Sequence, residues 1–541
     1  MKNIKYILLS LLTLGLFACE NDTLDDLRER NNTTEAPLPD LTAGTADFSN
    51  YIAIGASFTA GFTDNALFIA SQESSFPNIM ASKFRNAGGG AFTQPLMNDN
   101  FGGLALGGMR ITEPRLVFGG AGPVPLESVI GPVTVSTDIA LNNPSGPFNN
   151  LGVPGAKSFH LLANGYGNIA NFPFAANPYA VRLTGSTPDA SIIELAAAQS
   201  PTFFTLSEIG GNDVLGYALS GGDGSNPITD TATFDASLNA MVAALTANGS
   251  NGAIGNVPYI TSLSHFTTVP HNPLDPSNDA FGPLIPTLNT LFGAMNQVYA
   301  FLGVPERSIV FATDEASAVV IRDESIPNLG PQITQVLLAD PNFPAFIGQF
   351  GLPPQAAPLV AGLLGGTYGQ TRQATAEDLL VLPSSSVIGT VNEDFFQLLL
   401  SQGLTPELAG QFSVEGVTFP LEDNWVLLPS EQQEIFAATD AYNASISAVA
   451  NANGLALVDL NSILEEASTI GIQFDDYFMN TDLVFGGLVS LDGVHLTARG
   501  YALMANSFLK AIDDTFGSNF EASGNLAKAG DFPTNFSPTL Q

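Results

Sequence analysis

Residues 51–61 read YIAIGASFTAG, an apolar run that closes on Gly55 and is followed two residues later by Ser57. An uninterrupted apolar run of this length is typical of a strand buried on both faces of a parallel sheet. Parallel α/β sheets place their functional groups at the carboxyl ends of the strands. The small residues around Ser57 let its hydroxyl project at that edge, so we interpret Ser57 as a candidate nucleophile. The alternative is a serine that only caps the next helix.

Further along the chain, strand-like and helix-like stretches alternate. The expected strands are residues 202–206, 257–260 and 455–460, and the expected helices are residues 237–247 and 431–450. Strands that alternate with helices indicate layers of helices packed on a mostly parallel sheet. The sequence therefore predicts the α/β class.

Histidine is the side chain that most often acts as a general base near neutral pH. The chain has four histidines, which are His160, His265, His271 and His495. Asp492 lies three residues before His495, so its carboxylate can bond the Nδ1 proton and stabilise an imidazolium. An ordinary surface pair of Asp and His is the alternative. We expect the other three histidines to be structural.

Two glycine-containing segments offer groups that could bind an oxyanion. IGGND at residues 209–213 follows the strand predicted at 202–206, and the Asn212 amide can donate to a developing negative charge. NLGVPGA at residues 150–156 contains Gly155, whose N–H can approach the same atom closely. Taken singly, each segment is also what an ordinary turn contains.

These four elements together resemble the GDSL, or SGNH, hydrolase family. The positions that match the family's blocks are, in chain order, Gly55, Ser57 and Gly61, then Gly155, then Gly210, Asn212 and Asp213, and then Asp492 and His495. The match at the first block is incomplete, because Ala56 stands where the family has an aspartate. We expect that aspartate to be supportive, so activity would survive its loss.

The resemblance implies a fold and a mechanism. The fold would be a flavodoxin-like three-layer α/β/α sandwich with a parallel sheet. Ser57 would attack an ester carbonyl, His495 would move the proton, and Asp492 would orient His495. The N–H groups of Ser57 and Gly155, with the Asn212 amide, would form the oxyanion hole. Neither a cofactor nor a metal ion is expected.

The substrate class stays open at this point. The resemblance implies a serine esterase or lipase acting on carboxylic esters, either lipid acyl chains or small esters. One alternative is a carbohydrate esterase that removes acetyl groups. Another is a surface lipoprotein that binds a partner without catalysis.

The N-terminus reads as an export signal. Lys2 and Lys5 precede an apolar run at residues 7–17, which is too short to span a bilayer. Cys19, the only cysteine of the chain, ends this stretch, which resembles a bacterial lipobox. We therefore expect a signal peptide, lipidation at Cys19, and anchoring to a bacterial membrane, most simply the outer membrane. A plain secretory signal with a stray cysteine is the alternative.

The rest of the chain divides by composition. After a signal peptide at residues 1–18 we expect an acidic flexible tether at 19–47 and one hydrolase domain at 48–515, followed by a polar C-terminal tail at 516–541. Two insertions into that domain are expected, at about residues 64–149 and 270–429.

Within the second insertion, residues 343–366 are strongly apolar. This stretch either packs against the core or covers the cleft and lines a pocket for an acyl chain.

Charge excludes one class of partner. The formal net charge is -35, from 16 Lys and Arg against 51 Asp and Glu. A chain this acidic repels phosphate backbones, so we expect no binding to nucleic acid. The expected partners are an ester substrate and, through the lipid anchor, a membrane.

Overall fold

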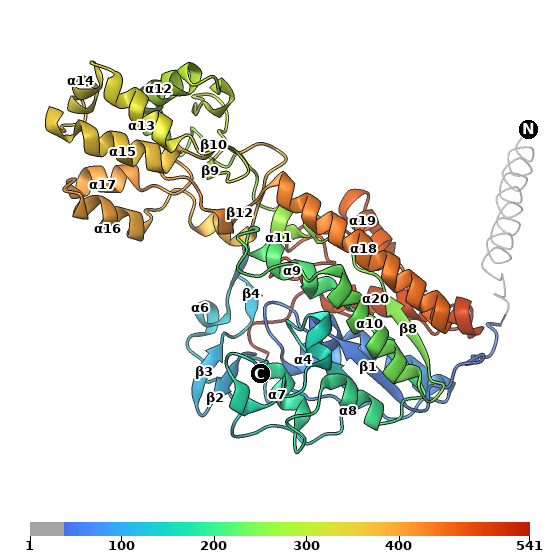
Figure 1. The fold of residues 1–541 in the computed structure, drawn as a ribbon. Helices are drawn as coiled ribbons and strands as arrows, with labels where there is room; N and C mark the ends of the chain where they lie inside the picture. The colour runs from blue at the N-terminus through green and yellow to red at the C-terminus, as the bar shows by residue number, and fades with distance from the viewer. Residues whose placement is uncertain (1–36, 541) are drawn as a thin grey trace, which may run out of the picture.

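The computed structural model describes residues 37–540, and a five-stranded parallel sheet lies at its centre (Figure 1). In spatial order the strands are β13 (Ala456–Val458), β8 (Asn251–Gly255), β7 (Phe203–Leu206), β1 (Tyr51–Gly55) and β6 (Asn150–Gly152). Every neighbouring pair in this sheet is parallel. All side chains of β1 and β7 are buried, as a sheet covered on both faces requires.

Helices cover both faces of this sheet. On one face α20 (Ala498–Phe516) packs on β13 and β8 and contacts α5 (Phe76–Phe84). On the other face the chain places α8 (Ile192–Ala198), α10 (Thr231–Thr246) and α18 (Pro429–Asn453) in contact with one another or with the sheet. The predicted α/β class is therefore confirmed.

The strand predictions hold in all but one case. The runs at residues 202–206 and 455–460 contain β7 and β13. The prediction at 257–260 is wrong, because the strand there is β8 at Asn251–Gly255, and Pro258 lies beyond its end. Proline has no N–H to donate to a neighbouring strand, which argues against a central strand at residues 257–260. The two glycines of β8 made that segment look like a loop in the sequence.

The chain between β1 and β6 forms α5 and a group of short elements at the edge of the sheet. These elements are α4 (Ile69–Glu73), β2 (Leu104–Leu106), β3 (Met109–Thr112), β4 (Leu116–Phe118), β5 (Pro123–Pro125) and α6 (Leu126–Ile130). Two antiparallel hairpins are the result, β2 with β3 and β4 with β5.

Residues 269–428 build a lobe that projects away from the sheet beyond α11 (Ser264–Thr267) and α18 (Figure 1). Its elements are β9 (Val320–Arg322), β10 (Thr371–Gln373), α12 (Ile285–Phe301), α13 (Gly330–Ala339), α14 (Phe343–Gly348), α15 (Ala357–Tyr368), α16 (Glu393–Ser401) and α17 (Pro406–Phe412). The lobe has its own apolar core, in which Phe292, Tyr299 and Ile333 are fully buried.

The apolar stretch at residues 343–366 lies inside this lobe. It forms α14 and most of α15, and Phe343 and Ile347 are buried in the core of the lobe. None of its side chains lines the cavity beside Ser57. The expectation that this stretch covers the cleft is therefore wrong: its apolar side chains are satisfied by the lobe itself.

Both ends of the described chain pack against the sheet's helices. Phe520 is fully buried against Phe48 and Phe84, and the Asn506 side chain bonds both the N–H and the carbonyl of Ala527. Cys19, the signal peptide and the tether up to residue 36 lie outside the described residues.

Between residues 37 and 540, no helix combines the length and apolar character needed to cross a membrane.

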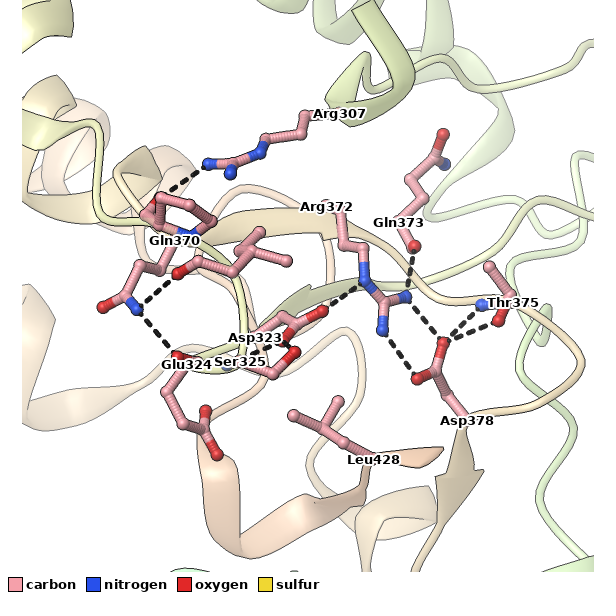
Figure 2. Close-up of polar contacts among 12 residues, drawn as sticks. Arg307, Asp323, Glu324, Ser325, Gln370, Arg372, Gln373, Thr375, Asp378 and Leu428 are labelled. Carbon is pink, nitrogen blue, oxygen red and sulfur yellow. Dashed lines mark hydrogen bonds and ion pairs between the residues drawn. The ribbon is translucent and has the colours of Figure 1, made fainter. Parts of the chain in front are cut away.

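A buried ionic network links β10 of the lobe to the segments that carry Asp323 and Asp378, as Figure 2 shows. Arg372 on β10 donates from Nε to Asp323 at 2.6 Å and from its two terminal nitrogens to Asp378 at 2.7 and 2.8 Å. The side chains of Asp323 and Asp378 are 3% and 0% exposed. Burial raises the pKa of the Asp378 carboxyl, but the bonds from Arg372 and Thr375 outweigh burial and keep that pKa below its usual value.

Removing the shared cation should destabilise the lobe. Arg372→Ala is expected to cost about 3–5 kcal/mol of unfolding free energy in urea denaturation, because it leaves two buried carboxylates without a counter-ion. The matched control is Arg110→Ala, since Arg110 also bonds two carboxylates, Glu113 and Glu127, but at the surface. That change should cost under about 1 kcal/mol. Equal losses for both variants would contradict this account.

Candidate active site

Ser57 stands at the carboxyl end of the central strand β1. It opens the short helix α3 (Ser57–Ala60), and it is 5% exposed. The turn from strand to helix requires Gly55, because a Cβ at that position would lie 2.3 Å from Thr59 Oγ1 and 2.6 Å from the Ser207 carbonyl oxygen. The glycine that closes the apolar run thus brings β7 close beside the turn that carries Ser57.

A carboxylate that the sequence did not single out holds this turn. Glu208, directly after β7, accepts hydrogen bonds from the N–H groups of Ala56, Phe58 and Thr59 at 3.2, 2.8 and 2.9 Å. Its Oε1 also accepts the Ser57 hydroxyl at 3.2 Å. Burial raises the pKa of the Glu208 carboxyl in spite of these donors. Glu208 has a φ of 59°, an uncommon backbone conformation for a side chain this large.

His495 and Asp492 form the pair that their spacing predicted. Asp492 Oδ2 lies 2.9 Å from His495 Nδ1, and Oδ1 accepts the backbone N–H groups of Val494 and His495. The Asn65 N–H donates to Oδ2 at 2.8 Å. Burial pushes the pKa of Asp492 upward, but His495 and these donors outweigh burial and hold that pKa well below its usual range. Asp492 is therefore a carboxylate fixed against one ring nitrogen.

The His495 ring lies over the segment that follows Ser57. Its centroid is 4.6 Å from the Phe62 ring and 5.8 Å from the Phe58 ring. No hydrogen bond joins Ser57 to His495 among the described residues, because the Ser57 hydroxyl is turned to Glu208. Catalytic hydrogen bonds often form only once substrate is bound.

The three groups expected to bind an oxyanion lie around the same edge of the sheet. Gly155 follows β6, the neighbour of β1, and its φ is 79°. Within the described residues, neither the Gly155 N–H nor the Ser57 N–H donates a hydrogen bond. Asn212, in the first turn of α9 (Gly211–Leu219), donates one amide hydrogen to the Ala156 carbonyl at 3.0 Å. That bond ties Asn212 to the loop that carries Gly155.

Asp64 is a second buried carboxylate that sequence reasoning missed. Its Oδ1 accepts the Leu491 N–H at 3.1 Å, and its own N–H donates to Ser490 Oγ at 3.1 Å. Burial raises the pKa of Asp64 to about 7, and the negative charge of Asp492 adds to that rise. Asp64 therefore stabilises the turn before His495 through hydrogen bonds to Ser490 and Leu491.

An apolar cavity of about 100 Å³ opens beside Ser57. Ser57, Glu208 and Asn212 form its polar end. Asn256 also lines the cavity, and the rest of the wall is mainly apolar, with Leu215, Ile260, Leu263, Leu464, Leu496 and Met504 among its side chains. Several of these side chains come from α19 (Leu460–Thr469), α20 and the segment around His495.

The other three histidines lie outside this arrangement of side chains. His160 accepts the Lys157 N–H at 3.1 Å and stacks on Tyr166. His265 is buried behind the turn of residues 490–495, where its N–H donates to the Gly493 carbonyl at 2.9 Å. Burial lowers the pKa of both His160 and His265.

Three carboxylates gather where the lobe meets α18. Each of Glu324, Asp423 and Glu431 offers an oxygen within 4.8 Å of the others, and within residues 37–540 they are the group of carboxylates that could hold a metal ion. Burial, with repulsion between the neighbours as a second cause, raises the pKa of Asp423 and of Glu431 to about 8. Asp423 Oδ1 is buried without a hydrogen-bond partner in the described structure.

This cluster should make stability depend on pH. A pKa raised from 3.8 to about 8 means that the folded state keeps a proton which the unfolded state releases. The stabilisation is therefore complete below about pH 4 and is lost as the pH rises through 8. Asp423→Asn removes one charge and supplies a donor to its neighbours. In the presence of a chelator, its Tm should equal that of the wild type at pH 4 and exceed it by a few degrees at pH 9.

The control is Asp314→Asn, because Asp314 is an exposed aspartate of the same lobe. Its Tm should follow the wild type at both pH values. A Tm difference for Asp423→Asn that does not grow with pH would show that the cluster shares no proton.

No known protein matches this chain closely enough to assign its site. The chain matches no family model, no curated protein and no solved structure. What the chain offers is therefore the arrangement itself: a serine at a strand end, a carboxylate-bound histidine nearby, and backbone N–H groups without partners beside the serine.

Proposed function

We propose that this chain is a serine hydrolase of carboxylic esters, with the SGNH type of fold and Ser57, His495 and Asp492 as its catalytic residues. The observation that carries the proposal is the 2.9 Å contact between Asp492 and His495, on a turn whose histidine ring packs against Phe58 and Phe62, next to Ser57. A carboxylate on Nδ1 leaves Nε2 as the base, which is the role that ester hydrolysis requires.

In the proposed reaction, Ser57 Oγ attacks the ester carbonyl carbon while its proton passes to His495 Nε2. The carbonyl electrons move to the oxygen, and the tetrahedral intermediate collapses when the leaving alcohol takes the proton from His495. Water then attacks the acyl-serine by the same route, and the carboxylic acid leaves with Ser57 restored. Asp492 stabilises the imidazolium formed in both halves of the cycle.

The oxyanion of each tetrahedral intermediate would face three donors. The N–H groups of Ser57 and Gly155 have no partner among the described residues, so they keep their hydrogens for a ligand. Asn212 donates one amide hydrogen to the Ala156 carbonyl and has a second one to donate. Fixed donors of this kind stabilise charge that develops in the transition state.

The cavity at Ser57 favours an acyl chain over an acetyl group on a sugar. Its wall is mainly apolar, and its polar side chains are those of Ser57, Glu208, Asn212 and Asn256. Glycan recognition needs polar side chains for the hydroxyl groups, whereas each CH₂ of an acyl chain gains about 0.8 kcal/mol on leaving water. We therefore propose esters of aliphatic acids as the substrate class, and export with a lipid anchor at Cys19 as the setting.

The nucleophile assignment predicts a large loss of activity. Ser57→Ala should lower kcat/KM for p-nitrophenyl esters by at least about 10³-fold without unfolding, because it removes the attacking atom. The wild type should hydrolyse hexanoyl esters faster than acetyl esters and react with a fluorophosphonate probe. Ser186→Ala, at an exposed serine, is the control and should keep full activity. Persistent labelling of Ser57→Ala would assign the reaction to another serine.

The hydrogen bonds of Glu208 predict a second, smaller loss. Glu208→Gln puts an amide donor where backbone N–H groups now find a carboxylate, so the turn at Ser57 shifts. A shift of about 1 Å at a nucleophile costs roughly 10² in kcat/KM. The loss should fall mainly on kcat with KM little changed, because the shift displaces the attacking atom and leaves the wall of the cavity in place.

Glu466→Gln makes the same chemical change at an exposed position of α19 and serves as the control. A Glu208→Gln enzyme with wild-type kcat would leave Glu208 without a role in positioning Ser57.

A further inference from the structure

The lobe contains the largest hollow described in this chain, and that hollow is separate from the site at Ser57. It has a volume of about 720 Å³, and no residue lines both it and the cavity beside Ser57. Small-molecule sites in proteins have volumes of roughly 300–1,000 Å³. The hollow lies between α12, α17 and the loops that precede and follow them.

The wall of the hollow is mainly apolar. Its larger apolar side chains include Leu274, Phe281, Leu284, Leu288, Leu291 and Val417. At Leu291, Phe350 and Phe412 it meets a second, smaller pocket of about 50 Å³, whose wall is almost wholly apolar. The two spaces therefore adjoin at these side chains, and the smaller one is called the inner pocket.

The charged groups of the wall carry only negative charge. Asp275 and Glu407 line the hollow, and no lysine, arginine or histidine is among the described residues that do so. Hydrogen bonds from Ser277 hold the pKa of Asp275 below its usual value, so this group is anionic at neutral pH. The polar side chains Asn278 and Gln411 add neutral hydrogen-bonding groups.

We propose that this hollow binds an uncharged lipid with one long alkyl chain, such as a long-chain ester or alcohol. The alkyl chain would fill the apolar hollow and reach toward the inner pocket, and an ester or hydroxyl group would face Asn278 and Gln411. A free fatty acid or an anionic phospholipid would bring a negative charge to Asp275 and Glu407 with no cation to pair it, so such ligands are selected against. The proposal does not depend on catalysis at Ser57.

A pair of probes that differ only in charge tests this selection. The full-length protein is titrated with cis-parinaric acid methyl ester and with the free acid, whose fluorescence rises in apolar surroundings. The ester should bind at least about tenfold more tightly than the acid at pH 8, a difference of about 1.4 kcal/mol. The same experiment in Ser57→Ala removes turnover and any covalent capture at Ser57.

Two substitutions locate the probe. Leu284→Glu adds a third negative charge at a half-exposed wall position, which the fold should tolerate, and it should weaken ester binding by about tenfold or more. Leu338→Glu makes the same change at an equally exposed leucine of α13 that lines neither space, so binding should be unchanged.

Ester and acid that bind equally well would overturn the charge selection. Unchanged ester binding in Leu284→Glu would place the probe elsewhere, for instance in the cavity at Ser57, and would also overturn the proposal. Absence of ester hydrolysis by the wild-type protein, with probe binding intact, would contradict the proposed function alone.

Discussion

The candidate site depends on one buried carboxylate. Glu208 reaches from the end of β7 to the turn after β1 and accepts three backbone N–H groups there. N–H groups that are removed from water without an acceptor are costly, so one carboxylate that accepts all three stabilises this turn. Neighbouring strands are thus linked where they end, and Ser57 is held at the carboxyl end of β1.

This link also explains how the turn exists without an acidic residue inside it. Ala56 offers no side-chain acceptor, so the turn cannot satisfy its own N–H groups. The acceptor comes instead from the adjacent strand, at a residue with a left-handed backbone conformation. Backbone strain of this kind persists only where surrounding contacts determine it, and four hydrogen bonds to one side chain supply such contacts.

The sequence predicted those parts of the molecule that depend on a local pattern of residues. Apolar runs gave the α/β class, and the spacing of Asp492 and His495 gave a pair that the structure brings into contact. Glu208 and Asp64 were not predictable in this way, because their partners are backbone groups on segments distant in sequence. The strand β8 was missed because its residues, NGAIG, carry almost no strand preference and owe their conformation to β7 and β13 on either side.

The two chain segments that connect the lobe to the rest of the protein lie next to each other. The chain enters the lobe at Val269, which pairs with Leu380, and leaves it at β12 (Val426–Leu427), which pairs with β11 (Leu379–Leu380). Entry and exit therefore lie on two sides of one short strand. A segment whose ends meet can be gained, lost or exchanged as a module without moving the sheet that receives it. Recombination at this point could thus exchange the lobe for another one while the same parallel sheet is kept.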